Sequence, residues 1–509
     1  MRLQLFAFLA AMVILAAPVF ADALADELSD YNFGLDASIV VPNKTFDKSP
    51  QLLTVSITAT NPSQNYMPVY VLRKNFEGKW EVLKLLGSLA PKDSTKLQLE
   101  VELRYDKVAK KKTEYLIVGR AENGELYGAK FEIPEDWSSY EKNVGDSITS
   151  AITGFVPVVG ILLAVLILLM AQAAYSNKSQ GVFTGEYTVR SLFFPNFEGR
   201  PFEEKIADIM IHPAFMAFEL ACVAILVLVM FGEVTRAAGV DQGIKIMLLA
   251  GVGAITVPFA YFAAAWYFEK REEGKPLRFF AGMFVWGMFA AFLSLLISSG
   301  FVAELSGAGI VPYAVIVTIL VSPIVEEILK GTGVLFMSGH HEYNDTLTGL
   351  LLGFTVGAGF AFVENWFYFA FRSNPYDVTL GGWLMLIAYR SFFNTLAHGC
   401  FTAAVSTAIG YLRSVDALKQ FARLAFAPGV FMAVMLHVIF NLTALADSYA
   451  IASREMPFFI FNPTLIILLA AMFFLVLVLA VIDEKKRKIK KLDTSAFQMI
   501  GMMGTGKRQ

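Results

Sequence analysis

The chain has 509 residues, of which 56% are hydrophobic and only 17% charged, and its mean hydropathy is +0.55. Soluble domains carry about 25% charged residues, so this composition excludes a soluble globular protein and indicates an integral membrane protein. The net charge of −2 gives no reason to expect a nucleic-acid partner, and two cysteines are too few for a disulfide framework or a cysteine-rich zinc site.

The first 23 residues have the features of a signal peptide. Arg2 precedes an apolar stretch, Leu3–Ala17, and small residues follow at Ala21 and Ala23. The apolar stretch is shorter than the ~20 residues that a spanning helix needs. We therefore predict that residues 1–23 are cleaved, and an uncleaved anchor is the alternative.

Residues 24–145 are predicted to form an extracytoplasmic, β-sandwich-like domain. Apolar side chains take every second position in 55–59 and in 97–103, which is the period of a strand with one buried face. An Asn-Gly pair at 123–124 and a looser turn at 75–78 indicate hairpins. Several short strands joined by such turns favour a small sandwich.

From residue 150 onward, long apolar runs predict about nine transmembrane helices. Alternate loops between them are rich in Lys and Arg, and such loops are cytoplasmic. The β-rich domain is then outside, while the basic tail 483–509 is cytoplasmic and contacts anionic lipid headgroups. The helices group into 150–301, which includes a cytoplasmic loop at 175–212, a core at 310–447, and a last helix at 458–482. The predicted spans are 152–174, 213–231, 245–268, 279–301, 310–338, 347–371, 382–411, 428–447 and 458–482.

Nearly all ionisable residues of the predicted membrane interior lie in four successive spans, starting with the pair Glu326 and Glu327. A carboxylate at this depth costs several kcal/mol, so the pair points to function. Glu326 and Lys330 are four residues apart and are predicted to pair, which leaves Glu327 free to meet water. Pro323 removes one backbone donor and is predicted to free the carbonyl near position 319.

The next three spans carry further polar residues at four-residue spacing, which places them on one face of each helix. Glycines at the same spacing, Gly349, Gly353 and Gly357, predict close packing of the sixth span against a neighbour. The remaining site candidates are Glu364 and Asn365 in the sixth span, Arg390, Asn394 and His398 in the seventh, and His437 and Asn441 in the eighth.

These residue types fit hydrolysis. A carboxylate can take a proton from water, and histidine or asparagine can stabilise the resulting oxyanion. Glu327 is the better candidate for the base by its predicted freedom. A divalent metal such as zinc, held by His398, His437 and Glu364, is an alternative to a site without cofactor. A proton- or ion-coupled transporter and a non-catalytic scaffold with a β binding domain remain open as other functions.

In this order, the motifs resemble those of the PrsW family of intramembrane proteases, which is related to the CAAX prenyl protease superfamily. They are E-E-x-x-K at 326–330, F-A-x-x-E-N at 360–365, Arg390 and His398 followed by F-T-A, and H-x-x-x-N at 437–441. The resemblance implies a peptidase, glutamic or metal-dependent, that cleaves membrane-associated proteins, including regulatory substrates such as anti-sigma factors.

The resemblance also implies roles for single residues. Glu326 and Glu327 would activate water, and His398, His437 and Asn441 would stabilise the oxyanion. Glu364 and Arg390 would support them. The β-rich domain and the helices of 150–301 depart from the compact family pattern, and we expect the exported domain to recruit or sense a substrate.

Overall fold

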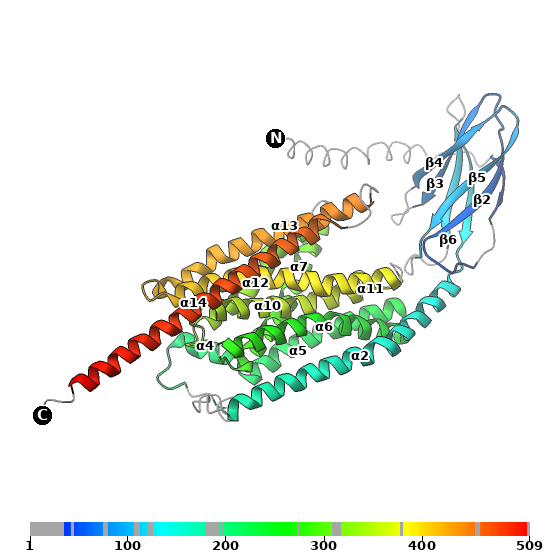
Figure 1. The fold of residues 1–509 in the computed structure, drawn as a ribbon. Helices are drawn as coiled ribbons and strands as arrows, with labels where there is room; N and C mark the ends of the chain where they lie inside the picture. The colour runs from blue at the N-terminus through cyan, green and yellow to red at the C-terminus, as the bar shows by residue number, and fades with distance from the viewer. Residues whose placement is uncertain are drawn as a thin grey trace, which may run out of the picture. The chain divides into compact units, whose positions relative to one another are not determined.

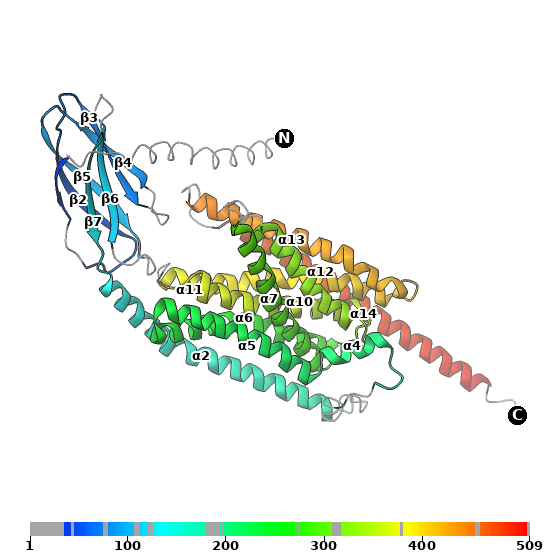
Figure 2. The same cartoon turned by 180° about the vertical axis from the view of Figure 1, so that it is seen from behind.

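The computed structural model describes residues 35–41, 45–74, 80–105, 112–120, 126–179, 194, 197–272, 274–307, 317–376, 380–452 and 459–505. The chain divides into two compact units (Figures 1 and 2). The first comprises Met1–Ile148 with Pro375–Leu380, and the second comprises Thr149–Asn374 with Gly381–Gln509. The predicted signal peptide and both predicted hairpin turns lie outside the described residues.

The first unit contains two antiparallel sheets. One has the order β1-β2-β5 and the other β4-β3-β6-β7. The predicted alternation is confirmed, because Val55, Ile57 and Ala59 on β2 are fully buried. Strands on either side of both predicted turns pair antiparallel, β3 with β4 and β6 with β7. The packing of the sheets as a sandwich stays a prediction. The strands are β1 Asp36–Val40, β2 Gln51–Thr60, β3 Met67–Lys74, β4 Trp80–Leu89, β5 Ser94–Leu103, β6 Lys112–Arg120 and β7 Leu126–Pro134.

An aromatic cluster lies where β7 gives way to α2 (Ser138–Ser179). Trp137 contacts Phe46 and Tyr105, with ring centroids 4.7 and 5.7 Å apart. The Tyr105 hydroxyl donates to Glu141 Oε1 at 2.7 Å, and burial together with this carboxylate raises the pKa of Tyr105. The start of α2 is thereby fixed to the β-rich unit.

The membrane-crossing part of α2 offers its side chains almost entirely to the surroundings. Only 6% of its most apolar window is buried in the protein. Exposed large side chains such as Phe155, Ile161 and Leu168 follow its length. Because apolar surface of this extent is stable only in hydrocarbon, lipid is the expected neighbour of this helix.

The second unit is a bundle around α10, whose most apolar window is completely buried and which packs against α6, α7 and α12 (Figures 1 and 2). Its elements are α4 Phe202–Met210, α5 Pro213–Ala238, α6 Val240–Glu272, α7 Leu277–Gly307, η2 Val317–Val321, α9 Ser322–Met337, α10 Thr346–Phe367, η3 Tyr368–Arg372, α11 Leu380–Tyr389, η4 Arg390–Asn394, α12 Thr395–Ser414, η5 Lys419–Ala425, α13 Phe426–Ala452 and α14 Phe461–Thr505.

Seven helices within the described residues are long and apolar enough to cross a membrane, so the predicted count of nine is not confirmed. The two predicted spans outside this set are 310–338 and 382–411. Each of these two predicted spans contains a π-helical segment, η2 in the first and η4 in the second. Each span also carries polar residues of the candidate site. Residues 308–316 lie outside the described part of the chain.

Glycines let α10 pack closely against α12 and α7. A Cβ atom on Gly357 would lie 2.2 Å from the carbonyl oxygen of His398 on α12, and one on Gly353 would lie 1.7 Å from Ser406 Oγ. On the opposite side, a Cβ atom on Gly359 would lie 2.0 Å from the carbonyl oxygen of Phe284 on α7. The predicted close packing is confirmed, and it brings the backbone of His398 against the helix that carries Glu364.

Candidate active site

Glu327 is the centre of a fully buried group of ionisable side chains. Its Oε1 atom lies 2.5 Å from Lys330 Nζ and 2.8 Å from His437 Nδ1. Lys330 Nζ also lies 3.0 Å from His398 Nδ1 and 4.2 Å from the centre of the Phe360 ring. α9, α10, α12 and α13 thus each contribute to one site.

The predicted pairing of Glu326 with Lys330 is wrong, because Glu327 forms this ion pair. Residues three apart share a helix face as well as residues four apart do, so spacing alone could not separate them. Contacts from neighbouring helices favour the pair of Glu327 with Lys330, because His437 contacts Glu327 and His398 contacts Lys330. Glu326 keeps a side chain that is 12% exposed, and its Oε2 lies 3.8 Å from His437 Nδ1.

Glu364 contacts three polar side chains of the predicted seventh span. Its Oε1 accepts from Arg390 Nη2 at 3.0 Å, and its Oε2 accepts from Asn394 Nδ2 at 3.0 Å. His398 Nε2 lies 2.9 Å from the same Oε2. Asn365 accepts from Asn394 at 3.1 Å and donates to the backbone carbonyl of Arg390 at 3.3 Å. The predicted four-residue spacing therefore does bring these side chains together.

The partners of His398 fix its tautomer. An ammonium group can only donate, so Nδ1 accepts from Lys330, and Nε2–H donates to the Glu364 carboxylate. Both ring nitrogens of His398 are therefore engaged. The carboxylate of Glu327 likewise requires that His437 donate from Nδ1, which leaves Nε2 as the other nitrogen of that ring.

Asn441 donates a hydrogen bond to the backbone at the point where Pro323 lacks an N–H. In a π-helix, the N–H of each residue bonds to the carbonyl five positions earlier, so Pro323 withholds a backbone donor from the carbonyl of Thr318, next to the predicted position 319. Asn441 Nδ2 donates to this carbonyl at 3.0 Å. The described contact thus places Asn441 on the backbone of η2, about two helical turns before the glutamates.

The four residues Glu326, Glu327, His398 and His437 each present a potential metal-ligating atom, and these atoms lie within 4.8 Å of one another. The Lys330 ammonium, however, already binds Glu327 Oε1 and His398 Nδ1. A divalent ion about 2.2 Å from that oxygen would lie within about 4.7 Å of the ammonium. The repulsion is then at least about 7 kcal/mol at an effective dielectric constant of about 20. As arranged, these residues do not fit a metal ion.

Glu364 does not belong to that group, although the sequence suggested it as a ligand. Its two oxygens are occupied by Arg390, Asn394 and the Nε2 of His398. An acceptor of three charged or polar donors has little capacity left for a metal ion.

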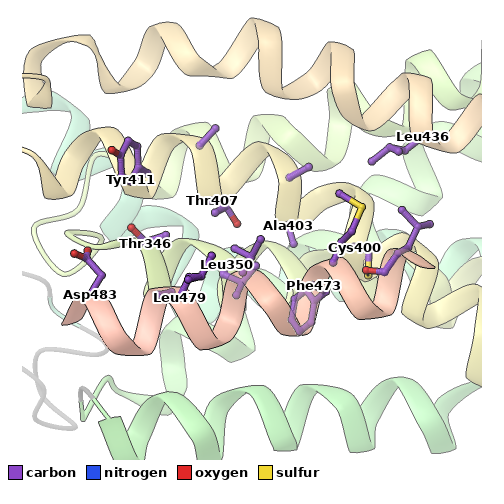
Figure 3. A pocket seen from close by; sticks show the side chains of 16 residues that line it. Thr346, Leu350, Cys400, Ala403, Thr407, Tyr411, Leu436, Phe473, Leu479 and Asp483 are labelled. Carbon is purple, nitrogen blue, oxygen red and sulfur yellow. The ribbon is translucent and has the colours of Figure 1, made fainter. Parts of the chain in front are cut away.

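A groove of about 650 Å³ runs between α10, α12, α13 and α14, outside this site (Figure 3). Cys400, Leu436 and Phe473 contribute to its apolar wall, while Tyr411 and Asp483 lie at one end. None of the predicted site residues lines it. The groove and the cluster of buried charges therefore occupy different faces of α12.

A second group of titratable residues joins α4 to the turn after α9, and the sequence did not predict it. His340 is fully buried, accepts from the Glu342 backbone N–H through Nδ1 at 3.1 Å and lies 3.5 Å from Asp208 Oδ1 through Nε2. Burial would raise the pKa of Asp208, but the neighbouring His340 imidazole and the charge of Arg200 hold it below its ordinary value. The adjacent histidines at 340 and 341 were the signal available in the sequence.

Comparison with known proteins gives the site a context. The family described as "PrsW family intramembrane metalloprotease" matches residues 275–480, a range that holds the candidate site residues from Glu326 to Asn441. Residues 275–480 match the PrsW family. The predicted resemblance is thereby confirmed, and PrsW homology supports a protease function in a multi-pass membrane protein.

A curated relative agrees with this match. The chain is 26% identical over 151 residues to the protein named "Protease PrsW" of Geobacillus kaustophilus (strain HTA426). The aligned segment covers 30% of this chain and 63% of the relative. The chain thus spans less than two thirds of the length of that relative. No solved structure matches the chain.

Proposed function

We propose that this protein is an intramembrane endopeptidase that hydrolyses peptide bonds of membrane-associated proteins with a water activated by glutamate. The observation that carries this proposal is the different environment of two adjacent carboxylates. Glu327 is held through Oε1 by Lys330 and His437 and is fully buried, whereas the Glu326 side chain is 12% exposed. The Oε2 atoms of both glutamates lack hydrogen-bond partners among the described residues, and that of Glu326 belongs to the side chain that water can approach. An acceptor of this kind is what a catalytic water needs.

Glu326 is therefore our candidate for the general base, in place of Glu327. It would take a proton from water while the oxygen of that water adds to the carbonyl carbon of the substrate. Transfer of the proton to the amide nitrogen would then accompany cleavage of the C–N bond, giving an amine and a carboxylic acid. Glu327 would keep Lys330 and His437 in place during these steps.

The oxyanion needs a donor, and His437 is the better placed of the two histidines. Both nitrogens of His398 are engaged, with Lys330 and Glu364, so we assign His398 to positioning. His437 retains Nε2 and can donate from it when protonated. We propose that Asn441 positions η2 through its hydrogen bond to the Thr318 carbonyl. Glu364 would position His398 by accepting from its Nε2–H.

Our proposals for the substrate and the orientation rest on the sequence and on the PrsW match. We propose single-span or membrane-associated substrates, including regulatory proteins, with the β-rich domain outside the cytoplasm and the basic tail inside. The exposed large apolar side chains of α9 and α13, such as Ile324 and Ile439, are compatible with approach of a substrate from the bilayer.

Co-expression with a panel of single-span membrane proteins tests the proposal. Glu326→Gln keeps the shape of the side chain but removes the base, and we expect cleavage to fall about 100-fold or more. Glu327→Gln breaks a buried ion pair and should also lower thermal stability by about 3–5 kcal/mol. Glu233→Gln, on the exposed ion pair of α5, is the matched control and should cleave normally. Cleavage at the wild-type rate by Glu326→Gln would refute the assignment of the base.

A further inference from the structure

We propose that the Lys330 ammonium is the resident cation of this site, and that it excludes a divalent metal ion from the Glu326, Glu327, His398 and His437 group. This departs from the metalloprotease description of the matched family. It concerns what occupies the site, so it holds or fails independently of whether the protein cleaves peptides.

The surroundings of Lys330 Nζ fit an ammonium group. Two of its three N–H donors face acceptors, Glu327 Oε1 at 2.5 Å and His398 Nδ1 at 3.0 Å. The face of the Phe360 ring lies 4.2 Å away and attracts a cation through its quadrupole. Divalent zinc binds nitrogen, sulfur and oxygen atoms, so the aromatic face contributes to holding the ammonium but supplies no ligand for zinc.

The depth of the lysine gives the proposal its consequence. The side chains of Lys330 and Glu327 are both fully buried, so neither can exchange its partner for water. An ion entering the group would have to displace the ammonium from Glu327 and His398 together. The Lys330 ammonium, which is part of the chain, therefore competes with any metal ion for Glu327 Oε1 and His398 Nδ1.

The same geometry predicts what happens when the lysine is removed. Glu364 holds His398 Nε2–H at 2.9 Å, which leaves the Nδ1 lone pair directed at the position of the ammonium. A carboxylate behind a ligating histidine is the arrangement found around many protein metal ions. Without the ammonium, two carboxylates and two imidazoles would face one another within 4.8 Å, which is a suitable set for Zn²⁺.

The test uses the full-length protein in detergent, with Zn²⁺ content after dialysis and Co²⁺ absorption as readouts. The wild type should bind no ion that depends on His437, as judged by comparison with His437→Ala. Lys330→Met should bind one additional Zn²⁺ per chain, with Co²⁺ affinity at least about 100-fold above that of the wild type. Adding His398→Ala to Lys330→Met should abolish the gain.

Lys245→Met is the matched control, because Lys245 also pairs with an acidic residue but lies on the surface of α6. The group of Glu204, His340 and His341 is unchanged in all variants, so differences report only on the site. A wild-type ion that His437→Ala removes would overturn the proposal, and so would a folded Lys330→Met that gains none. If Lys330→Met does not fold, the wild-type comparison with His437→Ala decides alone.

Discussion

A single methyl group added at Gly357 should separate Glu364 on α10 from His398 on α12. Its Cβ would lie 2.2 Å from the carbonyl oxygen of His398, about 1 Å closer than a tight contact, so α10 and α12 must separate by roughly that distance. The hydrogen bond between His398 Nε2 and Glu364 would lengthen from 2.9 Å beyond hydrogen-bonding range. Overpacking costs up to about 3 kcal/mol, which the better helix propensity of alanine offsets by about 1 kcal/mol.

For Gly357→Ala we therefore expect a net loss of about 2 kcal/mol in thermal unfolding. Cleavage should fall about 100-fold, the penalty typical of a 1 Å displacement in an active site. Gly232→Ala is the control, since nothing lies within 4 Å of the added methyl group on α5, and it should unfold at or above the wild-type temperature. If Gly357→Ala matches the wild type in both assays, the glycine contact does not position the site.

Three further predictions concern stability and can be measured by thermal unfolding in detergent. Asn441→Leu should cost about 1 kcal/mol, because the hydrogen bond from Asn441 Nδ2 to the Thr318 carbonyl is lost; an unchanged unfolding temperature would refute a stabilising role for this bond. Glu219→Leu should stabilise the protein, because both oxygens of this fully buried carboxyl lack partners among the described residues, and a fall in the unfolding temperature would reveal a hidden partner. Burial, together with His341, lowers the pKa of His340 despite the nearby Asp208 carboxylate, so the folded state resists a proton that the unfolded chain accepts. Stability should therefore decline as the pH falls below about 6.5, by at most about 1.4 kcal/mol per unit, and His340→Gln should flatten this slope between pH 7 and 5.

Much of the arrangement around Glu364 could be predicted from the sequence. Arg390, Asn394 and His398 are spaced for one helix face, and the structure brings all three to the same carboxylate. Glycines at the same interval explain how α10 comes near enough for this contact. The alternation in β2 was equally informative, because a strand with one buried face has only one possible register of side chains.

The errors arose where the chain leaves regular helical geometry or where a neighbouring helix makes the choice. Spacing permits Lys330 to pair with either glutamate, and only the approach of His398 and His437 selects Glu327. The exact position of the carbonyl opposite Pro323 depends on a π-helical hydrogen-bond pattern, so the sequence located it only to within one residue. The predicted count of nine spans is not confirmed, since seven helices among the described residues meet the length and hydropathy of a span.

The π-helical segment before the glutamates also bears on how the chain tolerates insertions and deletions. A five-residue turn holds one residue more than an α-helical turn of the same span, so η2 contains a spare position next to Ser322. A deletion of one residue within Val317–Val321 could be absorbed by closing this turn into ordinary α-helix. In a regular α-helix the same deletion would turn the two sides by about 100° relative to each other, but here the residue lost is the extra one and Glu326 and Glu327 keep their directions. This turn can thus lose one residue without moving the carboxylates themselves.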